Sequence, residues 1–440
     1  MSKAQILYRD IGDYLSREDK LKIVKEAHDI LSLEPQMKVL QPNEAGDWIN
    51  QRNSEFAEFI PLEPDEKEQS FFNKKAIGVA TNRDSWVFNF SKNELCKNMK
   101  GMINFYNKQI GNSVVNEDPT KISWTRALRK NFQNNIKHTF KEKTIAFCLY
   151  RPFTKQWLYY DRSFIESPGL WSQLFPLQEH KNIIICVSCV GTKNELSVLI
   201  SKNISDLHFI GDTQCFPLYW YEKRENKAQG ELFEKENEYT CHNAISNFIL
   251  DQAKTRYGSK VTREDIFYYV YGMLHSPSYR KTYANDLKKM LPRLPLVEDA
   301  KDFWAFSKAG RNLADLHLNY EEQEKPKEVK VSGIESGNFI VSKMEFLAKD
   351  KKDTIRYNSD ITISNIPAKA YEYIVNGKSA IEWIMERYAI TTHKESGIKN
   401  NPNDWAIEHD NPRCILDLLL SVITVSVETV EIVDGLPGGL

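Results

Sequence analysis

The sequence predicts an α+β fold, with a mainly helical part up to about residue 143 and a mixed body of helices and strands beyond it. Two observations carry this prediction. Apolar residues recur at helical spacing in the first part, whereas short apolar runs separated by turn residues begin at residue 144. The chain also has 440 residues and a hydrophobic fraction of 41%, which is enough for two or three domains with their own cores.

The helical part contains two capping signals. Residues 16–19 read Ser-Arg-Glu-Asp and residues 91–94 read Ser-Lys-Asn-Glu, and each pattern is typical of a helix start. Apolar residues follow the second signal at helical spacing, which predicts a helix over 92–110. A basic helix is expected over 121–138.

Short apolar runs beyond residue 144 predict strands at 145–150 and 183–190. Residues 262–265, Thr-Arg-Glu-Asp, should cap another helix, and helical spacing continues to about residue 320. The charged segment 221–238 is predicted to be a mobile loop.

The last third opens with a predicted linker over 322–331, followed by alternating strands through residue 363. Two helices, near 378–389 and 411–427, should close the chain. The expected domains are 1–143, 144–321 and 322–440.

Charge is distributed unevenly along a chain whose net charge is −1. Residues 121–162 carry ten Lys and Arg against two acidic residues, a net +8, and residues 254–293 carry nine against three, a net +6. Two interpretations stay open: solvated helix faces, which is the commoner case, or the lining of a groove that faces phosphates. In the second case both stretches should contribute to one positive face.

The sequence indicates no membrane segment and no metal site. The longest apolar run, 415–427, is shorter than the roughly 20 residues of a membrane helix, and Asp417 interrupts it. With no signal peptide after Met1, a cytoplasmic location is expected. Cys186 and Cys189 have the C-x-x-C spacing, but they lie in a predicted strand without a second ligand pair, so core thiols explain them better than zinc.

No catalytic motif is present in the sequence. An adenine-N6 methyltransferase needs a Gly-rich cofactor loop and an Asn-Pro-Pro-aromatic turn, and a P-loop needs Gly-x-x-x-x-Gly-Lys-Ser/Thr; none of these is found. The partial matches are residues 276–279, interpreted as a helix end, and residues 401–404, interpreted as a turn. We therefore predict no catalytic, cofactor-binding or metal-binding residues.

Several long blocks resemble the C-terminal specificity region of type ISP restriction-modification enzymes. The strongest are 271–279, 309–318, 371–388 and 396–405, the last reading Ser-Gly-Ile-Lys-Asn-Asn-Pro-Asn-Asp-Trp. Residues 6–150 resemble the segment that joins the methyltransferase core to that region, which makes 1–143 a helical methyltransferase tail and the remainder a mixed α/β target recognition domain.

The resemblance implies a sequence-specific DNA recognition module that positions an adenine-N6 methyltransferase and a translocating nuclease on duplex DNA. The implied partners are double-stranded DNA and the methyltransferase, helicase and nuclease portions of the system, with no membrane. S-adenosylmethionine, ATP and Mg are implied only for the full-length enzyme. Two alternatives stay open: a fragment that methylates only with its missing half, and a remnant that binds protein.

Candidate DNA-binding residues follow from residue type and from position in loops or basic stretches. Phosphate contacts are expected from cationic side chains, and base contacts from Asn, Arg and Lys in loops. The candidates are Asn82, Arg83, Lys130, Lys137, Arg151, Lys155, Lys193 and Asn194. Asn82 has an alternative role as a turn former, and Arg151 has one as a partner of Asp161.

One biochemical prediction follows from the missing motifs. The purified chain should neither bind S-adenosylmethionine tightly nor transfer methyl groups, because the cofactor loop and the catalytic turn are absent from the sequence. Titration calorimetry checks the first expectation and a methyl-transfer assay on duplex DNA checks the second. Micromolar affinity for the cofactor would contradict the prediction.

Overall fold

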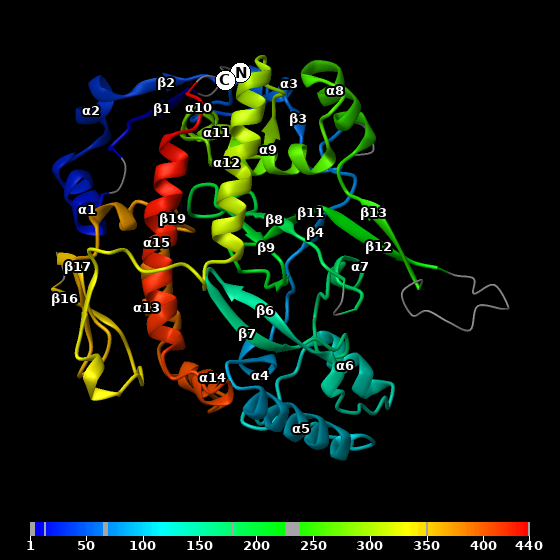
Figure 1. The fold of residues 1–440 in the computed structure, drawn as a ribbon. Coiled ribbons are helices and arrows are strands. Elements are labelled where there is room, and N and C mark those ends of the chain that lie inside the picture. Colours follow the sequence, from blue (N-terminus) through cyan, green and yellow to red (C-terminus); the bar gives the residue numbers. More distant parts are fainter. Residues whose placement is uncertain are drawn as a thin grey trace. The chain divides into compact units, whose positions relative to one another are not determined.

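The computed structural model describes residues 5–12, 15–64, 69–177, 180–224, 238–348 and 351–438 (Figure 1). It divides into two compact units, Met1–Glu58 and Phe59–Leu440. Helices and several small sheets occur together, so the predicted α+β class is confirmed.

The first unit contains short elements around a two-stranded antiparallel ribbon. Its elements are β1 (Ile6–Tyr8), α1 (Arg17–Glu26), α2 (Ile30–Leu33), β2 (Lys38–Leu40) and α3 (Ser54–Glu58). Strands β1 and β2 pair with each other. Ser16 caps α1 with the reciprocal bonds of a capping box, as predicted, and α1 buries none of its side chains.

The second unit carries most of the secondary structure. Its helices are α4 (Asp84–Val87), α5 (Lys92–Gln109), α6 (Arg126–Gln133), α7 (Trp171–Leu174), α8 (Asn247–Tyr257), α9 (Arg263–His275), α10 (Pro277–Thr282), α11 (Ala284–Leu287), α12 (Ala300–Leu318), α13 (Ala380–Arg387), α14 (Pro402–Glu408) and α15 (Cys414–Asp434). Its first strands are β3 (Ile60–Pro61), β4 (Ala76–Ile77), β5 (Phe88–Asn89), β6 (Ile145–Arg151), β7 (Thr154–Tyr159), β8 (Ile184–Val187), β9 (Val198–Ser201), β10 (Ile204–Ser205) and β11 (Gln214–Pro217). The later strands are β12 (Tyr219–Lys223), β13 (Tyr239–Asn243), β14 (Arg293–Leu294), β15 (Lys330–Ser332), β16 (Glu345–Ala348), β17 (Lys351–Arg356), β18 (Thr362–Ser364), β19 (Ile374–Val375), β20 (Lys378–Ser379), β21 (Thr391–Thr392) and β22 (Lys399–Asn400).

Three four-stranded sheets organise this unit, with strand orders β10-β6-β7-β5, β4-β11-β8-β9 and β15-β18-β17-β16. The predicted strand at 145–150 is confirmed as β6, and the one at 183–190 is shorter, as β8. In the first sheet, β10 runs parallel to β6, whereas β7 and β5 are antiparallel to their neighbours.

Strands β4 and β5 precede residue 143 but pair with strands that follow it. The five strands among the described residues up to 143 are two or three residues long, and they form no doubly wound sheet. The division into compact units falls after Glu58, so the domain boundaries at 143 and 321 stay predictions.

Helix α5 begins where the sequence places it and is anchored by a residue far away in the chain. Ser91 caps it, as predicted, through a bond from the Glu94 N–H to its hydroxyl. The Glu408 carboxylate of α14 accepts hydrogen bonds from the Lys92 N–H at 2.8 Å and from the Ser91 hydroxyl at 2.6 Å. A carboxylate at this position satisfies N–H groups that have no partner within the helix and interacts favourably with its dipole.

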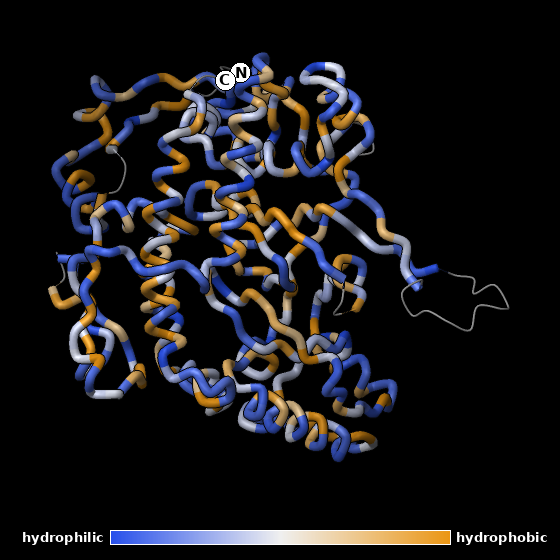
Figure 2. The backbone as a smooth tube through the Cα atoms, in the orientation of Figure 1, coloured by the Kyte–Doolittle hydropathy of each residue, from blue (hydrophilic) through white to orange (hydrophobic). Residues whose placement is uncertain are grey.

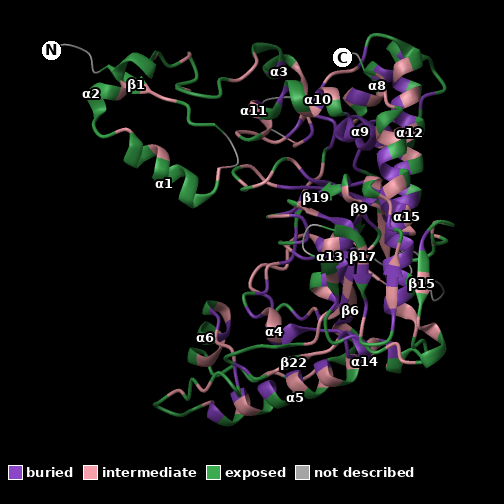
Figure 3. Ribbon diagram, turned by 90° about the vertical axis from the view of Figure 1, so that its left-hand side faces the viewer, coloured by how far each residue is buried: buried purple, intermediate pink, exposed green. Residues whose placement is uncertain are grey.

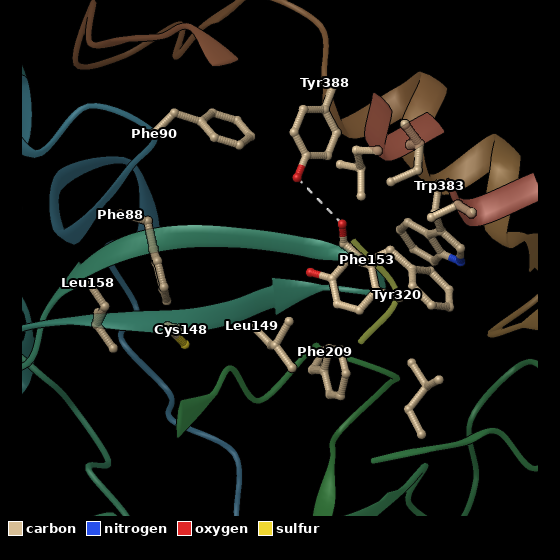
Figure 4. Close-up of a cluster of buried hydrophobic side chains, with 14 of the residues drawn as sticks. Phe88, Phe90, Cys148, Leu149, Phe153, Leu158, Phe209, Tyr320, Trp383 and Tyr388 are labelled. Carbon is tan, nitrogen blue, oxygen red and sulfur yellow. Dashed lines mark hydrogen bonds between the residues drawn. The ribbon is translucent and has the colours of Figure 1, made fainter. Parts of the chain in front are cut away.

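An apolar cluster fills the space between the β6–β7 hairpin and α13. Figure 4 shows Phe153, Tyr320 and Tyr388 gathered at the turn of that hairpin. All three are buried, and the Tyr388 hydroxyl donates to the Phe153 carbonyl at 3.5 Å. Helix α5 shows the hydropathy expected of a helix with one buried face, since hydrophobic and hydrophilic residues alternate along it (Figure 2).

Helices α9 and α12 approach each other through a pair of glycines. A Cβ atom at Gly310 would lie 1.9 Å from the Tyr268 carbonyl oxygen, and one at Gly272 would lie 2.2 Å from the Phe306 carbonyl oxygen. Only glycine therefore allows the two backbones to come this close. Thr262 caps α9 with a capping box, as predicted.

Several boundaries differ from the sequence prediction. The closing helix α15 begins at Cys414 and ends at Asp434, seven residues later than predicted, because apolar residues continue to alternate with polar ones there. The predicted loop 221–238 is wrong at its start, since residues 221–223 belong to β12, which pairs with β13 as an antiparallel hairpin; residues 225–237 lie outside the described part of the chain. The predicted linker ends in β15, which joins the third sheet.

Helix α15 is buried along most of its length, and α1 is exposed (Figure 3). Among the residues that the structure describes, no helix combines the length and the apolar character needed to cross a membrane.

The glycine pair yields a stability prediction. Gly310→Ala should lower the free energy of unfolding by about 1–3 kcal/mol, because the added methyl group overlaps the Tyr268 carbonyl and forces the helices apart. The matched control is Gly101→Ala in α5, where a Cβ meets nothing within 4 Å. That change should raise stability by about 0.5–1 kcal/mol. Urea unfolding of both variants checks the contrast, and an unaltered midpoint for Gly310→Ala would contradict it.

Candidate nucleic-acid interface

A cleft of about 680 Å³ lies where three segments of the second unit meet. One wall is the turn 80–85, the second is the turn 206–208 after β10, and the third is the hairpin formed by β21 and β22. Tyr150 of β6 and Gln156 of β7 contribute to its lining. The cleft therefore combines segments from the predicted first, second and third domains.

The turn 80–85 is held by its own side chains. The Asp84 carboxylate accepts a hydrogen bond from the Thr81 hydroxyl, and that hydroxyl accepts one from the Arg83 N–H at 3.2 Å. Asn82 has φ +51°, a left-handed conformation that Asn tolerates better than most residues. Its predicted alternative role as a turn former is thus confirmed, while its side chain stays exposed.

Arg83, a predicted DNA contact, is only 4% exposed. Its Nη2 donates to the hydroxyl of Thr125, the residue that caps α6. Burial lowers the pKa of Arg83 to about 10, against the opposing effect of the Glu166 carboxylate. In this conformation the guanidinium joins the turn to α6 and is not presented to solvent.

Arg151 is paired, but not with the residue that the sequence suggested. Its Nη1 lies 2.6 Å from the Asp206 carboxylate and its Nη2 lies 3.6 Å from that of Asp84, while its guanidinium stacks 3.9 Å from the centre of the Tyr150 ring. The expected partner Asp161 binds Lys141 instead, at 2.8 Å. The parallel pairing of β10 with β6 brings Asp206 to Arg151. This pairing could not be predicted from the spacing of residues in the sequence.

Asp206 forms a buried acidic position in the lining of the cleft. It is 1% exposed, and burial raises its pKa to about 7, although Arg151 acts in the opposite direction. The nearby Asp84 carboxylate adds to the increase. A buried carboxyl between an arginine and a second carboxylate is expected to titrate near neutral pH.

The predicted lysines fall into two groups. Lys130 lies in α6 and Lys137 follows that helix; both are exposed, and their ammonium groups make no hydrogen bond or ion pair with the described residues. Lys155 is held by the Glu321 carboxylate and lies 5.2 Å from the centre of the Tyr320 ring. Ser123, which precedes α6, lines the cleft, so α6 adjoins it.

Lys193 and Asn194 do not line the cleft. Lys193 is exposed, whereas the Asn194 amide donates to the Asn376 side chain at 2.8 Å. Asn194 also packs over Gly377, where a Cβ atom would lie 2.7 Å from its amide oxygen. This asparagine fixes the turn between β19 and β20.

The two basic stretches are far apart in the second unit. Figures 1 and 3 both show α6 at one end and α8 to α11 at the other. A positive face formed by both would therefore have to run the length of the unit. Several of their cations are also neutralised locally, as in the Arg129–Glu117 pair at 2.8 Å.

Sequence reasoning missed the hairpin that forms the third wall. The sequence marks residues 396–405 only by their resemblance, and it predicts a turn at 401–404. Asn401 instead caps α14, and Pro402 occupies the first turn of that helix. Asn at the cap followed by Pro is a helix-start signal, which could have corrected the interpretation.

Of the two cysteines with the C-x-x-C spacing, Cys186 lies in the core, whereas Cys189 is only partly buried. Cys186 is buried, and its sulfur lies 3.9 Å from that of Cys215. Within the described ranges, no three His, Cys, Asp or Glu side chains are arranged to hold a metal ion.

Comparison with known proteins gives consistent results. The sequence profile described as "Type ISP C-terminal specificity domain" matches residues 70–418. Among solved structures, a nuclease-deletion mutant of the Type ISP restriction-modification enzyme LlaGI, in complex with a DNA substrate mimic, is 40% identical with a TM-score of 0.86; the match covers 99% of this chain and 39% of that one.

Two further solved structures are similar. The ATP-dependent Type ISP restriction-modification enzyme LlaBIII bound to DNA is 38% identical with a TM-score of 0.88, over 99% of this chain and 28% of that one. The DrdV–DNA complex is 26% identical with a TM-score of 0.82, and the match covers 99% of this chain and 43% of that one. The chain thus spans less than half the length of each of these proteins. A search of curated protein sequences gave no match.

The raised pKa of Asp206 predicts a specific pH dependence. Because its folded-state pKa of about 7 exceeds its unfolded value, this group makes the native state less stable as the pH rises from about 4 to 7. Asp206→Asn lacks this effect, so the variant should gain stability relative to wild type between pH 5 and pH 8. Urea unfolding at both pH values checks the sign.

The matched control is Asp161→Asn. Burial alone would raise the pKa of Asp161, but the Lys141 and Ser163 hydrogen bonds lower it below its ordinary value. The stability that these bonds provide is lost only as the pH falls below about 4. The control should therefore be destabilised equally at pH 5 and pH 8, and the same constant difference in Asp206→Asn would contradict the prediction.

Proposed function

Because the chain belongs to the family of Type ISP C-terminal specificity domains, we propose that it is the DNA target recognition region of a Type ISP restriction-modification enzyme. One observation carries this proposal: the chain is similar over 99% of its length to two Type ISP enzymes, one solved on DNA and the other on a DNA substrate mimic. The cleft and the basic helix beside it supply the surface on which such a function acts.

The surface around the cleft has the two kinds of group that DNA recognition requires. Lys130 and Lys137 offer ammonium groups that no described carboxylate neutralises, and these suit phosphates. Asn82 offers an exposed amide, which suits base edges. Phosphate contacts fix the register of a protein on the duplex, and base contacts select the sequence.

The remaining activities of the enzyme are assigned to the portions outside this chain. We propose that adenine-N6 methylation, ATP-dependent translocation and cleavage lie there, with S-adenosylmethionine, ATP and Mg as their cofactors. Duplex DNA and those portions are then the partners of this chain. A system that acts on DNA within a bacterial cell also implies a cytoplasmic location.

Salt dependence tests the proposal. The full chain should bind a labelled duplex, and the logarithm of the association constant should fall linearly with the logarithm of the salt concentration. The slope should be about −0.9 for each phosphate that a cation neutralises. Lys130→Ala and Lys137→Ala should each flatten the slope by about 0.9, because one phosphate fewer is neutralised, and should weaken binding to every sequence alike. Fluorescence anisotropy over a salt series measures both quantities.

Lys155→Ala is the matched control for this experiment. The sequence placed Lys155 with the phosphate contacts, but its ammonium is paired with Glu321, so its removal should leave the slope unchanged. Absence of salt-dependent binding in the wild-type chain would contradict the proposed function and would favour a protein-binding role.

A further inference from the structure

The cleft wall formed by β21 and β22 is a short antiparallel ribbon with a closed tip. Thr391 pairs with Asn400 and Thr392 with Lys399. The His393 N–H donates to the Ile398 carbonyl at 2.9 Å, which closes the tip. The backbone of the ribbon therefore satisfies itself and does not depend on a ligand for its shape.

The base of the ribbon is bound to the first sheet. The Asn89 amide of β5 donates to the Lys399 carbonyl at 3.1 Å, and the Phe90 N–H donates to the Asn400 side chain at 3.0 Å. The Asn400 amide in turn donates to Gln156 of β7 at 3.1 Å. Asn89 and Gln156 are buried, so these bonds are protected from water. The tip is thus held at a defined position above the cleft.

The helix that follows the ribbon reinforces this position. Trp405 of α14 lies 5.1 Å from the Phe147 ring and 5.7 Å from the Trp157 ring, measured between ring centres. His409 stacks on Trp405, with 4.2 Å between the ring centres. On the other side in sequence, the Ile390 N–H, just before β21, donates to the Ser342 carbonyl at 2.9 Å. The ribbon therefore projects from a base that is anchored both before and after it in the chain.

Four polar side chains at and beside the tip are uncommitted, in contrast to the arginines near the cleft. Thr391, Thr392, Lys394 and Glu395 line the cleft and are exposed. None of the four side chains has a hydrogen-bond or ion-pair partner among the described residues. Arg83 and Arg151, by contrast, are engaged with protein groups.

The chemistry of the tip favours base edges over phosphates. Phosphates repel a carboxylate, so Glu395 would weaken a surface that only grips the DNA backbone. A glutamate can instead accept a hydrogen bond from the amino group of cytosine, and a lysine can donate to guanine O6 and N7. The major groove is wide enough to admit a two-stranded ribbon.

We infer that the β21–β22 ribbon enters the major groove of the target duplex and that Lys394 and Glu395 read base edges there. The inference rests on the proposed function and goes beyond it, since it names the specificity determinants. They lie on a segment for which sequence reasoning predicted no binding role.

The experiment selects bound duplexes from a random pool with the full chain. Wild type should yield a consensus. Lys394→Ala and Glu395→Ala should each relax one position of it by about 10-fold or more, with affinity for the unselected pool unchanged or, for Glu395→Ala, raised. Glu395→Gln is the most discriminating variant, because a glutamine amide hydrogen-bonds to adenine, whereas a glutamate carboxylate accepts a hydrogen bond from cytosine. The consensus that this variant selects should therefore change from cytosine toward adenine at one position.

Lys301→Ala and Glu298→Ala, at exposed positions outside the cleft, are the matched controls and should leave the consensus unchanged. An unchanged consensus in the Lys394 and Glu395 variants, with wild type still selecting one, overturns the inference and leaves the proposed function intact. A wild-type chain that binds no duplex, or that selects no consensus, overturns both.

Discussion

The close contact of α9 with α12 is the constraint on which the interior of the second unit depends. Two glycines let these backbones approach at distances that any side chain would prevent. His317 of α12 then bridges three helices, with its Nδ1 2.6 Å from the Tyr271 hydroxyl of α9 and its Nε2 2.9 Å from the Thr429 hydroxyl of α15. Burial lowers the pKa of His317 to about 3, so the ring is neutral and satisfies both hydroxyls.

The cleft depends on strand pairing in the same way that the helical core depends on the glycines. The pairing of β5 with β7 places the turn 80–85, and the parallel pairing of β10 with β6 places Asp206. Gly78 contributes to this arrangement, because a Cβ atom there would lie 2.5 Å from the Asp206 carbonyl oxygen. Polar side chains then fasten these segments together. The lining of the cleft is therefore held together by ion pairs and hydrogen bonds between its own side chains.

Different polar side chains around the cleft support the structure and remain available for recognition. Arg83, Arg151 and Asn194 are the residue types that contact DNA most readily, yet each is used to hold a turn or a strand end in place. Such bonds fix the geometry of the exposed groups beside them. A surface whose loops are fixed before binding loses less conformational entropy when it binds. Rigid support around a few uncommitted side chains is therefore consistent with selective recognition.

The sequence by itself determined the elements whose signals are local. The capping residues Ser16, Ser91 and Thr262 begin helices as predicted, because a cap and its N–H partner are three residues apart. Long blocks of resemblance also identified the family. The tertiary structure alone decided which polar groups are free. Arg151 meets Asp206, 55 positions away, and β22 is fixed to β5, 310 positions away, and neither pairing leaves a periodic or short-range pattern in the chain.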